Sequence, residues 1–275
     1  MIHLGLLGFP LVHSLSPKIH SAALDSCGLE GDYALFPINP DDLCGLKDLL
    51  ARVRSGEMRG LNVTIPHKQT VVPLLDELTP TAKAIGAVNT IYMKNKRLIG
   101  HNTDAQGFLA ELKHVGSFSD FGHAPSALVL GAGGAARAIV YALTNDGWNV
   151  TVAARRIDQA SEVARQFKTI HIMEFDFQIF QPANLQLIAN TTPMGMIPNA
   201  DQSPWPDSLP FPRHAVIHDL VYNPRETKLI KDARAQGLRA ITGLGMLVEQ
   251  AALAFELWTG QCPRRDILFS AVEKK

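Results

Sequence analysis

The chain has 275 residues, of which 46% are hydrophobic and 19% are charged. A prior of roughly 150 residues per domain predicts one or two domains, and this apolar content excludes an intrinsically disordered chain. Lysine plus arginine and aspartate plus glutamate number 26 each, so the formal net charge is zero. Proteins that bind nucleic acid by neutralising phosphates carry a basic excess, so we expect no nucleic-acid partner.

The three cysteines, Cys27, Cys44 and Cys262, are an odd number without a C-x-x-C spacing. This pattern disfavours a disulfide framework or a zinc site and favours three small buried side chains in a reducing compartment. The N-terminal segment lacks the basic head and the cleavage site of a signal peptide. No apolar run reaches the roughly 20 residues that span a bilayer. We therefore expect a cytoplasmic protein without a membrane partner.

The N-terminal part of the chain alternates short apolar runs with helical patterns. The expected strands are Ile2–Gly8, Tyr33–Pro37 and Arg59–Ile65, followed by a hairpin that joins Val88–Met93 to Arg97–Gly100. Apolar residues recur at helical spacing over 43–53, and a further helix is expected over Gln106–Val115.

The alternation continues to the end of the chain. The expected strands here are Ala127–Leu130, Asn149–Ala153, Gln186–Ala189 and Ala215–Asp219, and the expected helices are Ala136–Leu143, Leu244–Trp258 and Pro263–Val272. Several strands are apolar on both faces, as is typical of parallel strands that are covered on two sides. Strand and helix in alternation predict an α/β architecture with a parallel sheet.

The sharpest local signal is a glycine-rich turn between a strand and a helix. Residues 128–136 read L-V-L-G-A-G-G-A-A, so a strand runs into G-x-G-x-x-A. In a dinucleotide-binding fold, Gly131 permits the tight turn, Gly133 lets the backbone approach the pyrophosphate, and Ala136 lets the helix pack closely on the strand. The free N–H groups and the dipole of the following helix attract phosphates. A glycine-rich turn without a ligand is the alternative.

The next expected strand indicates which dinucleotide is bound. NAD-binding folds place Asp or Glu about 20 residues after the first glycine, where it accepts from the ribose 2′-hydroxyl. Here the strand runs into Ala154-Arg155-Arg156, and no carboxylate appears before Asp158. Two guanidinium groups suit a 2′-phosphate, so the sequence favours NADP over NAD. Surface arginines at a strand end are the alternative.

Polar residues follow the expected strands of the N-terminal part. Ser16 is well placed to cap a helix with Pro17 at its first position, but capping does not account for Ser14. Two hydroxyls two residues apart on one loop can both donate to a single carboxylate. Lys68 and Asp104 also follow expected strands, where a solvated lysine and a helix-capping aspartate are the alternatives.

Seven motifs together resemble the shikimate dehydrogenase family, and they occur in the family's order over nearly the whole chain. They are G-F-P-L-V-H-S-L-S-P, N-V-T-I-P-H-K, G-A-V-N-T, N-T-D-A-Q-G, G-A-G-G-A, N-T-T-P-M-G-M and G-L-G-M-L-V-E-Q. The resemblance implies two α/β domains. One is a substrate domain over 1–104, completed by C-terminal helices over 242–275, and the other is a Rossmann-type NADP-binding domain over 105–241.

The resemblance also implies an activity and the residues that carry it. The activity is the reversible NADPH-dependent reduction of 3-dehydroshikimate to shikimate, in chorismate and aromatic amino acid biosynthesis. Lys68 and Asp104 are implied at the reacting carbonyl or hydroxyl. Substrate contacts are implied for Ser14, Ser16, Thr64, Asn89, Tyr222 and Gln250. Cofactor contacts are implied for Gly131, Ala132, Gly133, Gly134, Ala135, Ala154, Arg155, Arg156, Leu220 and Gly243. No metal is expected.

The chemistry suits these residue types. When hydride reaches a ketone carbon, negative charge develops on the oxygen, and a cation or proton donor there lowers the barrier. Lys68 offers both, and Asp104 beside it would hold the ammonium in place. Many family members read Asn-Arg-Thr where this chain has Ala154-Arg155-Arg156, which leaves the 2′-phosphate contacts open.

Two alternatives to this activity stay open. One is a quinate/shikimate dehydrogenase with broader cofactor use, and the other is an NADP-binding regulator without turnover, because a fold does not guarantee activity. In each case we expect a small-molecule ligand and a monomer or homodimer.

Overall fold

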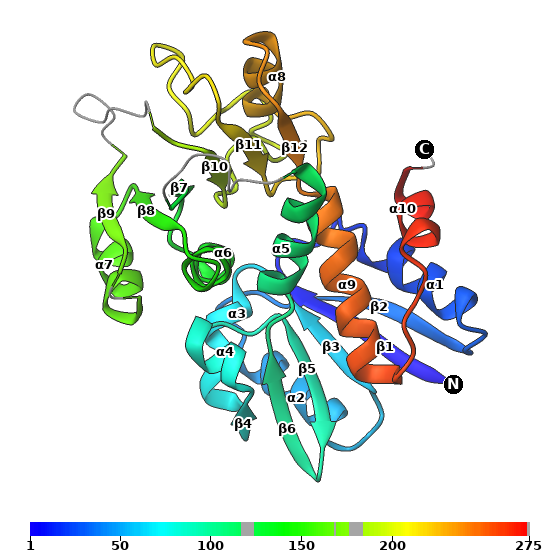
Figure 1. Cartoon of the computed structure of the whole chain (residues 1–275). Helices are drawn as coiled ribbons and strands as arrows, with labels where there is room; N and C mark the ends of the chain where they lie inside the picture. Colours follow the sequence, from blue (N-terminus) through cyan, green and yellow to red (C-terminus); the bar gives the residue numbers. More distant parts are fainter. Residues whose placement is uncertain (117–123, 168, 176–183, 274–275) are drawn as a thin grey trace. The chain divides into compact units, whose positions relative to one another are not determined.

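The computed structural model describes residues 1–116, 124–167, 169–175 and 184–273 (Figure 1). The chain divides into two compact units, Met1–Gly107 with Leu247–Lys275 (unit 1) and Phe108–Met246 (unit 2). The expected divisions are at 104/105 and 241/242, whereas the observed ones fall inside helix α5 (Asp104–Val115) and helix α9 (Leu244–Thr259). The observed divisions thus lie 3 and 5 residues after the ones that the resemblance implies.

Unit 1 contains a mixed six-stranded sheet in the order β2-β1-β3-β5-β6-β4. The strands are β1 (Ile2–Gly8), β2 (Gly31–Pro37), β3 (Gly60–Val63), β4 (Glu77–Leu78), β5 (Thr90–Lys94) and β6 (Arg97–His101). β1 runs parallel to β2 and β3, whereas β5 runs antiparallel to β3 and β6. The expectation of a parallel sheet therefore holds for β1, β2 and β3, and it is wrong at β5, which runs antiparallel to both of its neighbours. The cause is the expected hairpin, whose turn residues Asn95 and Lys96 both have positive φ, as two-residue hairpin turns require.

The helices of unit 1 cover this sheet. They are α1 (Ser16–Ser26), α2 (Leu43–Arg54), α3 (His67–Thr70), α4 (Pro80–Ile85), the unit 1 part of α9, and α10 (Arg265–Glu273), together with a 3-10 turn over Val72–Leu74. Helix α2 is capped by the Asp42 carboxylate and buries Leu46, Leu49, Leu50 and Val53 in the main core cluster. This face matches the helical spacing in the sequence.

The cysteines do not lie where the sequence led us to expect. Cys44 and Cys262 are exposed and Cys27 is half-buried, and all three are free thiols. The expectation of three buried side chains is wrong. Cys44 lies two positions before Leu46 in α2, and therefore off the helical face that enters the core.

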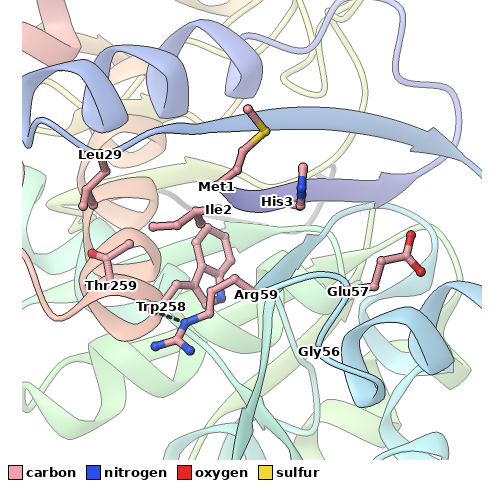
Figure 2. Close-up of a pocket in the computed structure, with 9 residues that line it drawn as sticks. All are labelled: Met1, Ile2, His3, Leu29, Gly56, Glu57, Arg59, Trp258 and Thr259. Carbon is pink, nitrogen blue, oxygen red and sulfur yellow. Dashed lines mark hydrogen bonds between the residues drawn. The ribbon is translucent and has the colours of Figure 1, made fainter.

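The last turn of α9 closes the unit 1 core against β3. A Cβ atom on Gly60 would lie 2.1 Å from Nε1 of the wholly buried Trp258, so glycine is required there. The Trp258 indole donates to the carbonyl oxygen of Ile91 at 3.1 Å, and Arg59 Nε donates to the Trp258 carbonyl at 2.8 Å. A cavity of about 300 Å³ beside Trp258 and Arg59 is also lined by the first residues of β1 (Figure 2). None of the predicted site residues lines this cavity.

Unit 2 is a parallel six-stranded sheet in the order β12-β11-β10-β7-β8-β9. Its strands are β7 (Ser126–Leu130), β8 (Asn149–Ala154), β9 (His171–Glu174), β10 (Leu187–Asn190), β11 (Val216–Asp219) and β12 (Ala240–Thr242), and its helices include α6 (Gly134–Asn145), α7 (Ile157–Gln166) and α8 (Lys228–Ala235). If the strands are renumbered 1 to 6 from β7 to β12 and the order is taken from β9, this is the 3-2-1-4-5-6 arrangement of the Rossmann fold. The edge strands β9 and β12 were not predicted from the sequence, because neither is a buried apolar run.

Within the described residues, no helix is both long enough and apolar enough to cross a membrane.

A buried histidine in unit 1 is expected to make stability depend on pH. His20 lies in α1 with its ring stacked on Tyr33 at 4.3 Å, and burial lowers its pKa to about 3. In the unfolded chain a histidine titrates near its usual value of about 6.5. The unfolded state therefore binds the extra proton first, and the contribution of neutral His20, complete above that pH, is lost as the pH falls toward the folded pKa.

We expect this one group to lower the free energy of unfolding by about 3 kcal/mol between pH 7 and pH 4. Denaturant titrations of the wild type and of His20→Phe, which keeps a ring against Tyr33, measure that loss. The variant should lose correspondingly less stability over the same range. An equal loss in the two proteins would contradict the assignment.

Candidate active site

The predicted site residues of unit 1 follow strand ends at one edge of its sheet. β1 and β3 are parallel, so Ser14 and Ser16, which follow β1, and Thr64, which follows β3, lie at the same edge. β5 runs the other way, so Asn89, which precedes it, lies there too. β6 is antiparallel to β5, and its end leads to Asp104. The topology thus gathers five residues that are far apart in the sequence.

Lys68 and Asp104 form a largely buried ion pair at this edge. Lys68 Nζ donates to Asp104 Oδ2 at 2.6 Å, and the two side chains are 14% and 5% exposed. Asp104 is the first residue of α5, but its carboxylate bonds the side chains of Lys68 and Asn89 rather than the backbone of its helix. The geometry therefore excludes both alternatives considered above, the solvated lysine and the capping aspartate.

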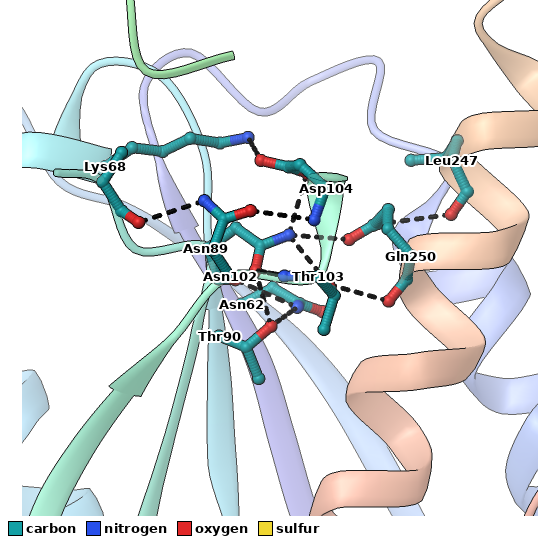
Figure 3. A network of polar contacts seen from close by, with 10 residues as sticks. Asn62, Lys68, Asn89, Thr90, Asn102, Thr103, Asp104, Leu247 and Gln250 are labelled. Carbon is teal, nitrogen blue, oxygen red and sulfur yellow. Dashed lines mark hydrogen bonds and ion pairs between the residues drawn. The ribbon is translucent and has the colours of Figure 1, made fainter. Parts of the chain in front are cut away.

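Asn89 and Gln250 complete a polar network around this pair (Figure 3). Asn89 Nδ2 donates to Asp104 Oδ1 at 2.8 Å and to Gln250 Oε1 at 3.2 Å. Asn89 Oδ1 accepts from the backbone N–H of Thr103 at 2.8 Å, which fixes the orientation of the amide. Four predicted residues from four separate segments are thereby brought into direct contact.

Further buried polar residues that the sequence analysis did not single out hold Asn89 and Asp104 in place. Asn62 Nδ2 donates to the Asn89 carbonyl at 3.1 Å, and the Thr90 hydroxyl donates to Asn89 Oδ1 at 2.9 Å. Asn102 Oδ1 accepts from the backbone N–H of Asp104 at 3.0 Å. All three belong to the quoted motifs, so their signal in the sequence was a polar residue within an expected strand, for Asn62 and Thr90, or just after one, for Asn102.

The two serines lie close together, but their arrangement differs from the expected one, in which Ser16 caps the helix. Helix α1 begins at Ser16 itself, with Leu15 at its N-cap and no side-chain cap. Ser14 Oγ instead accepts from the backbone N–H of Ser16 at 3.2 Å. The expected capping role of Ser16 is wrong, because the preceding serine turns back to the first helical N–H. Tyr222, the remaining predicted substrate residue, belongs to unit 2, where it is half-buried after β11.

The glycine-rich turn of unit 2 has the expected strand–turn–helix setting. Gly131 has φ +110°, and a Cβ atom there would lie 2.6 Å from Thr191 Oγ1, so only glycine fits without strain. Gly133 precedes α6, and among the described residues other than its chain neighbours no atom lies within 4 Å of the position that its Cβ would occupy. Ala136 is fully buried in α6. The turn thus leaves open space beside Gly133, directly before the first residues of α6, Gly134 and Ala135, whose N–H groups have no partner within the helix.

The other predicted residues of unit 2 lie at the carboxyl ends of its strands. Gly131 N–H donates to the Ala153 carbonyl at 2.8 Å, which brings the turn beside the end of β8. There Ala154 is buried, and Arg155 and Arg156 are exposed. Farther along the sheet, a Cβ atom on Gly243 would lie 2.1 Å from the Leu220 carbonyl oxygen, so these two predicted residues are in close contact.

In the part of the chain that the structure describes, no group of three or more acidic, histidine or cysteine side chains could hold a metal ion.

The sequence of this chain is similar to that of enzymes of known activity. A shikimate dehydrogenase (NADP(+)) from Salinibacter ruber is 42% identical over 276 residues, which cover 97% of this chain and 95% of the relative. The chain belongs to the shikimate dehydrogenase family. In agreement, the family model described as the shikimate dehydrogenase substrate binding domain matches residues 6–91, and the model described as the shikimate 5'-dehydrogenase C-terminal domain matches residues 243–267.

Solved structures of shikimate dehydrogenases share the fold. The enzyme from Thermus thermophilus, in complex with NADP(H) and shikimate, is 39% identical with a TM-score of 0.86, and the match covers 100% of this chain and 99% of that one. A 5-ketofructose reductase of Gluconobacter is also similar, at 31% identity and a TM-score of 0.84, covering 99% and 98% of the two chains. The two α/β units predicted from the shikimate dehydrogenase motifs are thereby confirmed.

Proposed function

We propose that this protein is an NADP-dependent shikimate dehydrogenase that reversibly reduces 3-dehydroshikimate to shikimate. The observation that carries the proposal is the buried Lys68–Asp104 pair, which Asn89 and Gln250 surround at one edge of the unit 1 sheet. The names of the relatives point to the same substrate and cofactor. We assign substrate binding to unit 1 and cofactor binding to unit 2.

The residues of unit 2 fit NADP. The open space beside Gly133 and the N–H groups at the start of α6 suit a pyrophosphate held by the backbone. The exposed Arg155 and Arg156, at the end of the neighbouring strand, suit a 2′-phosphate. Leu220 and Gly243 would lie beside the nicotinamide. When bound, NADPH supplies the hydride.

Lys68 would stabilise the charge and transfer the proton at the reacting oxygen. As the ketone carbon is reduced, its oxygen gains negative charge, and an adjacent ammonium stabilises that charge and donates the proton. In the oxidation of shikimate, the same nitrogen, as the neutral amine, takes the proton of the hydroxyl and becomes the ammonium. Asp104, bonded to Lys68 Nζ at 2.6 Å, would hold the amine in position and accept a hydrogen bond from a ring hydroxyl. Burial strengthens both effects because it lowers the local dielectric.

The remaining unit 1 residues would bind the substrate. The bond from Ser16 N–H uses an acceptor lone pair of Ser14 and leaves the Ser14 hydroxyl to donate to a substrate carboxylate, together with the hydroxyl of Ser16. We propose contacts from Thr64, Asn89 and Gln250 to the ring hydroxyls.

Ser14→Ala is expected to raise the KM for shikimate about tenfold and to leave kcat nearly unchanged. The reason is that the hydroxyl bonds the carboxylate equally in the ground state and the transition state, and a hydrogen bond to a charged group contributes roughly 1.5 kcal/mol or more. Initial rates at varied shikimate concentration measure it, with the KM for NADP as an internal control. An unchanged KM for shikimate would remove Ser14 from the site.

The decisive experiment is to incubate the purified protein with shikimate and NADP and to follow the absorbance of NADPH. Parallel reactions with quinate, and with NAD in place of NADP, separate the proposed enzyme from one with broader use. Binding of NADPH without turnover of any of these would instead support a regulator.

A sugar ketone is the second substrate class to test, because a similar protein is a 5-ketofructose reductase. Oxidation of NADPH by 5-ketofructose, without activity on shikimate, would replace the proposed function.

A further inference from the structure

A buried carboxylate in unit 2 plays no part in the chemistry described above. Asp219, the last residue of β11, is fully buried. Its Oδ1 accepts from Asn190 Nδ2 at 2.8 Å and from the backbone N–H of Val221 at 3.0 Å, and its Oδ2 accepts from the Thr227 hydroxyl at 2.6 Å. These three donors are uncharged. Burial raises the pKa of this carboxyl, while the three hydrogen bonds act in the opposite direction.

Asp219 ties the segment after β11 to the segment after β10. Asn190, the last residue of β10, donates to Asp219, and its Oδ1 accepts from the backbone N–H of Thr192 at 2.9 Å and from the Thr192 hydroxyl at 2.7 Å. One carboxylate and one amide therefore hold two loops that follow neighbouring strands at the same edge of the sheet.

Both loops reach residues that the proposed function places at the cofactor. On one side, Thr191 lies against the glycine turn, since its hydroxyl donates to the Leu130 carbonyl at 2.7 Å and a Cβ on Gly131 would collide with it. On the other side, Val221, which donates to Asp219, accepts from Gly243 N–H at 3.3 Å. Leu220, between Asp219 and Val221, is the residue in contact with Gly243.

An apolar side chain could fill this space without the cost of desolvating a carboxylate. What the carboxylate adds is the ability to accept several hydrogen bonds at fixed angles, and so to set the path of the backbone at Leu220 and Val221.

We infer that Asp219 is a positioning residue for the nicotinamide half of the cofactor, acting through Leu220, Val221 and Asn190; this rests on the proposed NADP-dependent function. The adenosine half is served by Arg155 and Arg156, at the end of β8, a strand that does not adjoin β11. A change at Asp219 is therefore expected to weaken binding of the nicotinamide half of NADPH and to leave binding of the adenosine half unchanged.

The test compares NADPH with 2′,5′-ADP, which carries the adenosine half alone. Asp219→Asn keeps the shape of the side chain but replaces one acceptor oxygen by an NH2 group. This group then faces a hydrogen-bond donor and cannot accept from it. We expect its Kd for NADPH to rise about tenfold, because a buried donor loses its partner, while its Kd for 2′,5′-ADP stays within about twofold of the wild type. Isothermal titration calorimetry measures both values. An equal rise for both ligands, or a rise for neither, would overturn the inference.

A second pair of variants keeps the inference testable if Asp219→Asn does not fold. Thr227→Val removes the hydroxyl that donates to Asp219, and Thr227→Ser restores it. We expect the valine variant to weaken NADPH binding selectively and the serine variant to recover it. Thr144→Val is the matched control, since the Thr144 hydroxyl of α6 donates to helix carbonyls, at 2.8 Å to Val140 and 3.2 Å to Tyr141, so its NADPH affinity should be unchanged. Failure of serine to restore binding would count against the role.

The outcomes distinguish this inference from the proposed function. Wild-type protein that binds NADPH but does not oxidise shikimate would overturn the proposed function, and the binding comparison would still decide the role of Asp219. Active wild-type enzyme with an unchanged ratio of affinities in both variants would overturn the inference alone. Wild-type protein that does not bind NADPH would overturn both.

Discussion

Replacing Lys68 by alanine is expected to lower kcat for shikimate oxidation by about 10³-fold and to change the KM for shikimate little. The Lys68 nitrogen matters most in the transition state, where it shares the proton of the reacting oxygen and stabilises the charge there, and general acid–base groups contribute between about 10² and 10⁴ in rate. Steady-state kinetics at saturating NADP measure both parameters. A variant with a near-normal kcat would refute the role of Lys68.

The matched control for this experiment is Lys83→Ala, because Lys83 is an exposed lysine of α4 in the same unit. It should retain wild-type kinetics. Lys68→Ala leaves the buried Asp104 carboxylate without its cation, and such a loss costs stability, on the order of 3–5 kcal/mol. Denaturant titration of the variant is therefore needed to show that the lost rate belongs to folded enzyme. Lys68→Met, which refills the space of the aliphatic chain, should show the same loss of kcat.

Replacing Arg155 by alanine is expected to lower the preference for NADP over NAD by about 10- to 100-fold. A guanidinium bonded to phosphate oxygens is a charge-assisted pair, and each such bond contributes roughly 1.5–3 kcal/mol. The preference is the ratio of kcat/KM values for the two cofactors. We expect the change to come mainly from a higher KM for NADP, since NAD lacks the 2′-phosphate.

Arg165→Ala provides the control for Arg155→Ala, because Arg165 is an exposed arginine in the last turn of α7, the helix that follows Arg156. It should leave the preference unchanged. Arg156→Ala shows how the two neighbouring cations share the phosphate. An intact preference in both Arg155→Ala and the double variant Arg155→Ala/Arg156→Ala would show that another group binds the 2′-phosphate.

Much of the cofactor half of the molecule was predictable from local sequence. The turn needs a residue without a side chain at Gly131, and the glycine pattern that marks it lies within a few adjacent positions of the chain. The strands β7 and β8 were predicted to within one residue at each end, because buried parallel strands are continuous apolar runs. In contrast, the role of Asp219 had no local signal, since its partners Asn190 and Thr227 are 29 and 8 residues away.

The substrate half shows where local patterns fail. Ser16 looked like a helix cap, and Ser14 was found to make the bond instead, because a shift of one residue at a helix start changes which N–H is free. Cys44 looked buried by residue type but lies on an exposed helix face. Periodicity gives the face of a helix more reliably than composition gives the burial of a single small residue.

By itself, the sequence determined the α/β class, the glycine turn and, through its motifs, the family of this chain. Patterns of this kind depend on neighbours a few positions apart, so they can be recognised in the sequence alone. Only the tertiary structure decided that Lys68 meets Asp104, 36 residues away, and that Asn89 and Gln250, 161 residues apart, share one hydrogen bond. Contacts over such distances depend on strand order and direction. The antiparallel course of β5 and β6 is what returns Asn89 and Asp104 to the edge where β3 ends.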